Sequence, residues 1–174
     1  MRLTRRAFLA AGAALAAGAL LDGFVAEPHL LLSVTRVEVD AGLGYGLVVA
    51  HLTDLHFTGF PSPLYGAVLR AVEEARPDAA VITGDLVSTR KGAEDAVDFV
   101  ARISELAPTF IVWGNWDHWV LGRDLDALAE RLERGGDVRV LVNEHAEVEG
   151  VSLAGVDDPY TGHDDLGRAL EESR

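Results

Sequence analysis

Three short stretches of the sequence carry side chains that could hold a metal ion. The first contains Asp54 and His56, the second ends in Asp85, and the third contains Asn115 and His118. An extended backbone turns side chains two residues apart to the same side, so Asp54 and His56 are predicted to coordinate the same metal ion. Asp-x-His alone is a weak signal. It gains weight because the other two stretches accompany it.

Each of these stretches follows a short apolar run that predicts a buried strand. The runs cover residues 47–50, 79–83 and 110–113. Between them, apolar residues recur at helical spacing over residues 64–75 and 94–106. Strands that alternate with helices predict parallel βαβ units in one sheet, whose ligands bind beyond the carboxyl ends of the strands. All three stretches stand there, so the sequence predicts a site at this edge.

The other predicted elements complete an α/β fold. Residues 32–39 alternate imperfectly and predict an edge strand, which a glycine-rich turn at 42–46 joins to the next strand. A phosphate-binding glycine loop is rejected here, because such a loop follows a strand and opens a helix. Further elements follow in order: a helix over 125–132, a buried strand over 138–142, a hairpin around Gly150 and a last helix from Asp165.

Composition limits the classes of function. A length of 174 residues allows one domain with an ordinary core. The absence of cysteine excludes disulfides and thiolate metal ligands. The chain has 28 acidic and 15 basic residues and a formal net charge of -13, which disfavours a nucleic-acid surface. Most of the excess acid is assigned to solubility.

The first 26 residues predict an export signal or a short membrane anchor, followed by one domain over residues 27–174. Arg5 and Arg6 precede an uncharged apolar stretch from Ala7 to Leu21, which is similar to a twin-arginine signal. An ordinary secretory signal and an anchor are the alternatives, although the stretch is shorter than the roughly 20 residues of a spanning helix. The predicted location is periplasmic or on the outer face of the cytoplasmic membrane. The predicted export partner is the twin-arginine translocase.

The three motifs together resemble the calcineurin-like metallophosphoesterase superfamily. They are Asp54-x-His56, Gly-Asp85, and Gly-Asn115 with an acidic residue and a histidine close behind. The resemblance runs from about residue 34 to the end. Within the superfamily, the chain is most similar to the exported bacterial phosphodiesterase branch. The implied fold is a β-sandwich core flanked by helices.

The resemblance also implies a dinuclear centre with two divalent metal ions, Mn, Fe or Zn. By this resemblance, Asp54 and His56 bind the first ion, Asp85 bridges both ions and Asn115 binds the second. Such a pair generates a metal-bound hydroxide that attacks phosphorus, assisted by a proton donor. The predicted function is therefore phosphoester hydrolysis. The predicted substrates are small-molecule phosphoesters or lipid and cell-envelope phosphoesters, the latter with membrane association.

The first departure from the family pattern concerns the proton donor. The family usually places a histidine directly after the asparagine, where this chain has Trp116. His118 is the candidate for the catalytic donor, and a packing or capping role is the alternative. Trp116 and Trp119 are candidates to line a substrate mouth, whereas Trp113 is predicted to lie in the core.

A second departure is the lack of the later histidines that complete the family's metal centre. His163 is the candidate to replace one of them, and no His-x-His pair follows His118. The sequence therefore predicts a fold truncated at the C-terminus, the N-terminal part of a longer protein, with weak activity on its own. The alternatives are a non-catalytic metal- or phosphate-binding exported module and a structural exported domain.

Overall fold

The computed structural model describes residues 32–171 of the chain. These residues belong to two compact units, of which the smaller contains residues 32–37 and 62–68 and the larger contains residues 38–61 and 69–171. The predicted export signal, residues 1–26, lies outside the described residues. Within residues 32–171, no helix is long and apolar enough to cross a membrane.

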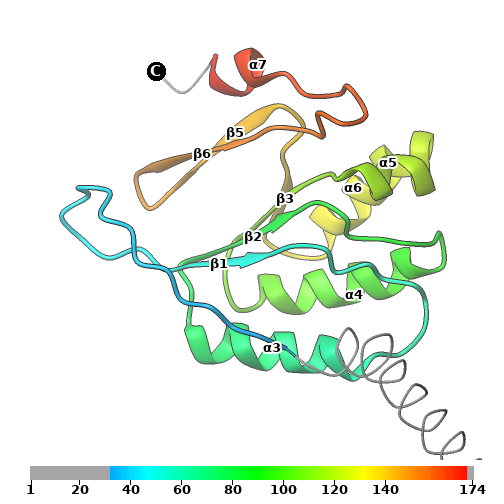
Figure 1. Cartoon of the computed structure of the whole chain (residues 1–174), viewed down its shortest axis with the longest axis horizontal. Helices are drawn as coiled ribbons and strands as arrows, with labels where there is room; N and C mark the ends of the chain where they lie inside the picture. Colours follow the sequence, from blue (N-terminus) through cyan, green and yellow to red (C-terminus); the bar gives the residue numbers. More distant parts are fainter. Residues whose placement is uncertain (1–31, 172–174) are drawn as a thin grey trace, which may run out of the picture. The chain divides into compact units, whose positions relative to one another are not determined.

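The larger unit is built on a parallel four-stranded sheet with the strand order β1-β2-β3-β4 (Figure 1). The strands are β1 Val49–Leu52, β2 Ala79–Thr83, β3 Thr109–Val112 and β4 Val138–Val140. Parallel neighbours need a crossover connection, and each connection here contains a helix. The predicted α/β fold with a parallel sheet is therefore confirmed.

The helices are close to those that the apolar spacing predicts, with one addition. The helical segments are α3 Pro63–Ala75, α4 Gly92–Ser104, α5 Asn115–Leu121, the 3-10 turn Gly122–Asp124, α6 Leu125–Arg134 and α7 Leu166–Leu170. Helix α5 was not predicted, because it has only 7 residues and no apolar stripe of helical period. As a result, the third predicted stretch, with Asn115 and His118, continues into a helix rather than a loop.

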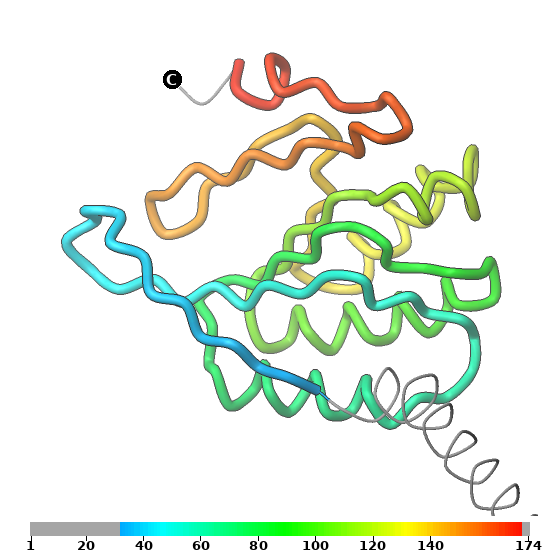
Figure 2. The backbone as a smooth tube through the Cα atoms, viewed as in Figure 1, coloured from blue at the N-terminus to red at the C-terminus, as the bar shows by residue number. Residues whose placement is uncertain are grey.

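Apolar side chains cover both faces of the sheet. One face lies against α4, which contacts β3 and β4, and the fully buried side chains here include Ile82, Ile103 and Ile111. The other face carries an antiparallel hairpin, β5 Glu144–Val148 with β6 Val151–Gly155 (Figure 2). Ala146 of the hairpin and Phe110 of β3 belong to one core cluster there. The hairpin thus forms a second, smaller β layer.

Three predictions about the start of the domain are wrong. Residues 32–39 do not form an edge strand, and the glycine-rich segment at 42–46 bends without joining two strands. Strand β1 is not buried, since Val49 is 46% exposed. The reason is pairing: among the described residues β1 pairs only with β2, and residues 32–39 pair with no strand. Alternating valines favour a strand but cannot supply its partner.

Glycine at position 92 is predicted to be required for the packing of α4 against the loop after β1. A Cβ atom at Gly92 would overlap the carbonyl oxygen of Phe57. We expect Gly92→Ala to lower the free energy of unfolding by about 1–3 kcal/mol, although alanine favours the helix. Urea denaturation measures this change. Gly46→Ala is the control, because its Cβ would meet nothing within 4 Å and its effect should stay within about 0.5 kcal/mol. Equal stability of the two variants would contradict the assignment.

Candidate metal centre

The three predicted stretches lie side by side beyond the carboxyl ends of β1, β2 and β3. The loop after β1 continues the parallel pairing, because the His56 N–H donates to the Asp85 carbonyl at 2.9 Å and Phe57 bridges Val87. The start of α5 joins them, since the Trp116 N–H donates to Oδ1 of Asp85 at 3.0 Å. Hydrogen bonds donated by backbone N–H groups therefore hold the three stretches together.

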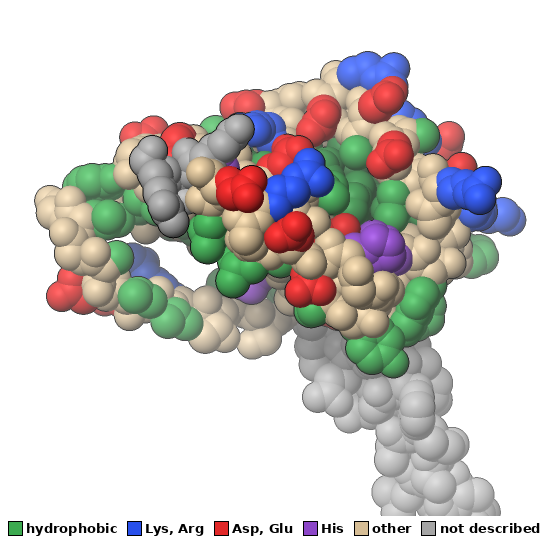
Figure 3. Space-filling model, turned by 90° about the horizontal axis from the view of Figure 1, so that it is seen from above, with side chains coloured by type: hydrophobic (Ala, Val, Ile, Leu, Met, Phe, Trp, Pro, Cys, Tyr) green, Lys and Arg blue, Asp and Glu red, His purple; other side chains and the backbone are tan. Residues whose placement is uncertain are grey.

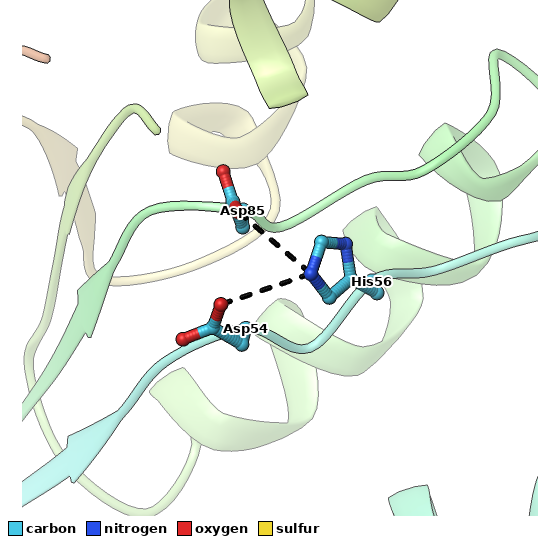
Figure 4. A group of neighbouring side chains, drawn as sticks. All are labelled: Asp54, His56 and Asp85. Atoms are coloured by element: carbon cyan, nitrogen blue, oxygen red, sulfur yellow. Dashed lines mark ion pairs between the residues drawn. The ribbon is translucent and has the colours of Figure 1, made fainter. Parts of the chain in front are cut away.

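Asp54, His56 and Asp85 form a group in which one ligand atom of each lies within 4.8 Å of the others. Nε2 of His56 is 3.7 Å from Oδ1 of Asp54 and 3.7 Å from Oδ2 of Asp85 (Figure 4). Ligand atoms about 2 Å from one ion are themselves roughly 3–4 Å apart, so the spacing fits a shared ion. Nδ1 of His56 lies 2.8 Å from the Ser88 hydroxyl, which turns Nε2 toward the carboxylates.

The backbone at all three residues has the left-handed conformation. The φ angles are 55° at Asp54, 48° at His56 and 54° at Asp85. Each such residue costs roughly 1–2 kcal/mol, and this strain concentrates at functional sites. The predicted extended backbone between Asp54 and His56 is therefore wrong, because left-handed turns bring the two side chains together.

Asn115 stands next to this group as the first residue of α5. The residue before it, Gly114, packs so closely on the second stretch that a Cβ atom there would overlap Oδ1 of Asp85. Asn115 is half-buried, and its role as a ligand stays a prediction. Oxygen and imidazole donors suit Mn, Fe or Zn, and the residues present fit such ions.

Asp117, which the sequence pattern alone did not assign to the site, connects the second and third stretches. Its fully buried carboxylate accepts hydrogen bonds from the N–H groups of Leu86 at 3.2 Å, Val87 at 2.9 Å and Gly114 at 2.9 Å. Burial raises the pKa of Asp117, and these three donors counteract part of the rise. An acidic residue in the first turn after Gly114 is a capping signal that could have identified it.

His118 lies on the other side of α5 from Trp116. The Trp116 ring meets His56 edge to face at 5.7 Å, and two residues further along a helix the side chain points about 200° away. Nε2 of His118 lies 2.8 Å from Oδ1 of Asp157, and its ring stacks on His163 at 4.1 Å. The catalytic role of His118 stays a prediction. Among the described residues, the metal-binding group contains neither histidine.

Removal of the Asp117 carboxylate should loosen the metal centre. We expect Asp117→Ala to lower the free energy of unfolding by about 3 kcal/mol, because three N–H groups lose their acceptor. We expect Mn²⁺ affinity to fall about tenfold or more, as for other residues that support metal ligands. Urea denaturation and calorimetric titration measure the two effects. Asp98→Ala on the exposed side of α4 is the control, and unchanged values for Asp117→Ala would refute the supporting role.

Comparison with known proteins is consistent with this geometry. The family model of the calcineurin-like phosphoesterases matches residues 47–168, a range that contains the sheet and all three stretches. The comparison with curated proteins finds no match. The match covers most of the chain, and the parallel sheet with flanking helices is consistent with the fold of this family. The chain therefore belongs to the calcineurin-like phosphoesterase family.

Proposed function

We propose that the protein hydrolyses phosphoesters with two divalent metal ions, acting as a phosphodiesterase or phosphatase. The observation that carries this proposal is the convergence of Asp54, His56 and Asp85, whose ligand atoms lie within 4.8 Å of one another. Family membership supplies the reaction class. In this proposal Asp54 and His56 hold one ion, Asp85 is shared by both, and Asn115 holds the second. When bound, the ions provide positive charge for the phosphoryl oxygens and activate water at neutral pH.

The hydrogen bonds of Asp85 and His56 support these roles. One oxygen of Asp85 accepts the Trp116 N–H at 3.0 Å, whereas the other lies 3.7 Å from Nε2 of His56. The carboxylate is thus anchored by Oδ1 and presents Oδ2 to the centre. His56 is oriented in the same way by Ser88 at its other nitrogen.

The residue directly after Asn115 cannot serve as the proton donor. Trp116 occupies the position after Asn115, and an indole N–H donates hydrogen bonds but no proton. His118 is the proposed donor, because it is the first histidine after Asn115 and lies on the same helix, α5. The His118 side chain is mostly buried. Either its ring must rotate or the substrate must move before His118 and the substrate come into contact.

The central experiment measures hydrolysis of bis(p-nitrophenyl) phosphate with added Mn²⁺ and after chelation. We expect the wild type to release p-nitrophenol only with metal present, and Asp85→Asn to lose most of this activity. Calorimetry should show a larger loss of metal affinity for Asp85→Asn than for Asn115→Ala, because only Asp85 contributes charge to two cations.

A control variant and two alternative outcomes distinguish hydrolysis from metal binding alone. Asp98→Asn removes an exposed charge on α4 and should behave as the wild type. Metal binding without hydrolysis would favour the non-catalytic binding module. Small and equal losses of affinity in Asp85→Asn and Asn115→Ala would refute the bridging role of Asp85.

We further propose that the protein acts outside the cytoplasmic membrane after twin-arginine export, on a small-molecule or cell-envelope phosphoester. The support is the sequence around Arg5 and Arg6.

Replacement of both Arg5 and Arg6 by lysine should retain the protein in the cytoplasm, because the twin-arginine route requires the arginines themselves. Cell fractionation with immunoblotting measures the location of the protein. Arg2→Lys is the matched control. Normal export of the double variant would indicate the general secretory route instead.

A further inference from the structure

A row of aromatic side chains begins at the metal centre and leads to the surface. Trp116 meets His56 with ring centroids 5.7 Å apart, Trp119 meets Trp116 at 5.9 Å, and Tyr160 meets Trp119 at 5.8 Å. Exposure increases along the row, from 42% at Trp116 to 57% at Trp119 and 78% at Tyr160. These three residues, Trp116, Trp119 and Tyr160, are called the aromatic row.

Two separate segments hold the aromatic row in place. Trp116 and Trp119 are three residues apart on α5 and so lie on one side of the helix. Tyr160 belongs to the turn after β6, where Oδ2 of Asp158 accepts the Thr161 N–H at 2.7 Å. This turn is joined to α5 through the contact of His118 with Asp157. Hydrogen bonds thus hold the turn that carries Tyr160, and ring contacts link the three side chains of the row.

Packing alone does not explain the aromatic row. Trp113, at the end of β3, is only 4% exposed and shows where a tryptophan of this chain contributes to the core. Trp119 and Tyr160 instead leave most of their surface in water, next to a site proposed to bind a phosphoryl group. Contiguous exposed apolar surface of this kind marks binding sites.

The charges nearby indicate what the aromatic row binds. Its neighbouring turn contributes Asp157 and Asp158, and the whole chain has a net charge of -13. On the face shown in Figure 3, Lys and Arg side chains are interspersed with Asp and Glu. The acidic turn beside Tyr160 and the negative net charge of the chain disfavour a second anionic group next to the aromatic row. An uncharged planar group can use the exposed ring faces and edges.

We infer that the aromatic row binds an aromatic ester group of the phosphoester substrate. This inference rests on the proposed function, because the phosphoryl group must be held at the metal centre. The contact of Trp116 with His56 then places the first ring of the row beside the bound phosphoryl group. The substrate class is a phosphoester with an aryl or heteroaromatic substituent.

The test compares phenylphosphonate with methylphosphonate, which carry the same anionic group and differ in the ring. Calorimetry on the Mn²⁺-loaded protein should show about tenfold or greater preference for phenylphosphonate. Trp119→Ala should bring the ratio of the two affinities close to one, and Trp119→Phe should preserve most of the preference. Leu106→Ala removes an exposed apolar side chain just before the amino end of β3, away from the carboxyl end where the site lies, and should leave the ratio unchanged.

The remaining outcomes overturn the inference in distinguishable ways. Equal affinity for both phosphonates in the wild type would refute the role of the aromatic row and leave the proposed hydrolysis intact. Binding of neither phosphonate, together with no hydrolysis, would overturn both proposals. Equal affinities, together with cosedimentation with phosphatidylcholine vesicles that Trp119→Ala abolishes, would instead identify a membrane contact.

Discussion

The close approach of the second and third stretches is the constraint on which the metal centre depends. A Cβ atom at Gly84 would lie 2.9 Å from the Cα of Gly114, so both positions need glycine for their backbones to meet. This approach puts Asp85 within reach of the Trp116 N–H. The buried carboxylate of Asp117 then bonds to both loops and offsets part of the strain of the left-handed residues.

Trp116 connects the centre to the surface. Its backbone N–H holds the carboxylate of Asp85, and its ring begins the aromatic row at His56. A single position thus serves both the proposed catalysis and the proposed recognition of the substrate. The family's usual histidine at this place would provide a proton donor, whereas tryptophan provides an apolar contact. The donor function therefore has to come from elsewhere, and His118 is the proposed source.

Local sequence was sufficient for most of the fold. The apolar runs at 79–83 and 110–113 correspond to β2 and β3, and the helical spacing over 64–75 and 94–106 corresponds to α3 and α4. These predictions succeed because the spacing of apolar residues along the chain reflects which side of an element is buried. The prediction for residues 47–50 is wrong in one respect. Its composition predicts burial, but its place at the edge of the sheet exposes it. Strand order is a property of the whole chain, which no local window contains.

The sequence by itself determined the types, order and spacing of Asp54, His56 and Asp85, and with them the family. Only the tertiary structure decided how these residues converge, through left-handed turns and hydrogen bonds between loops that are about 30 residues apart. It also decided that the buried carboxylate of Asp117 connects the second and third stretches and that His118 turns toward Asp157. The physical reason is that a side chain's partner depends on which distant segments the sheet brings together.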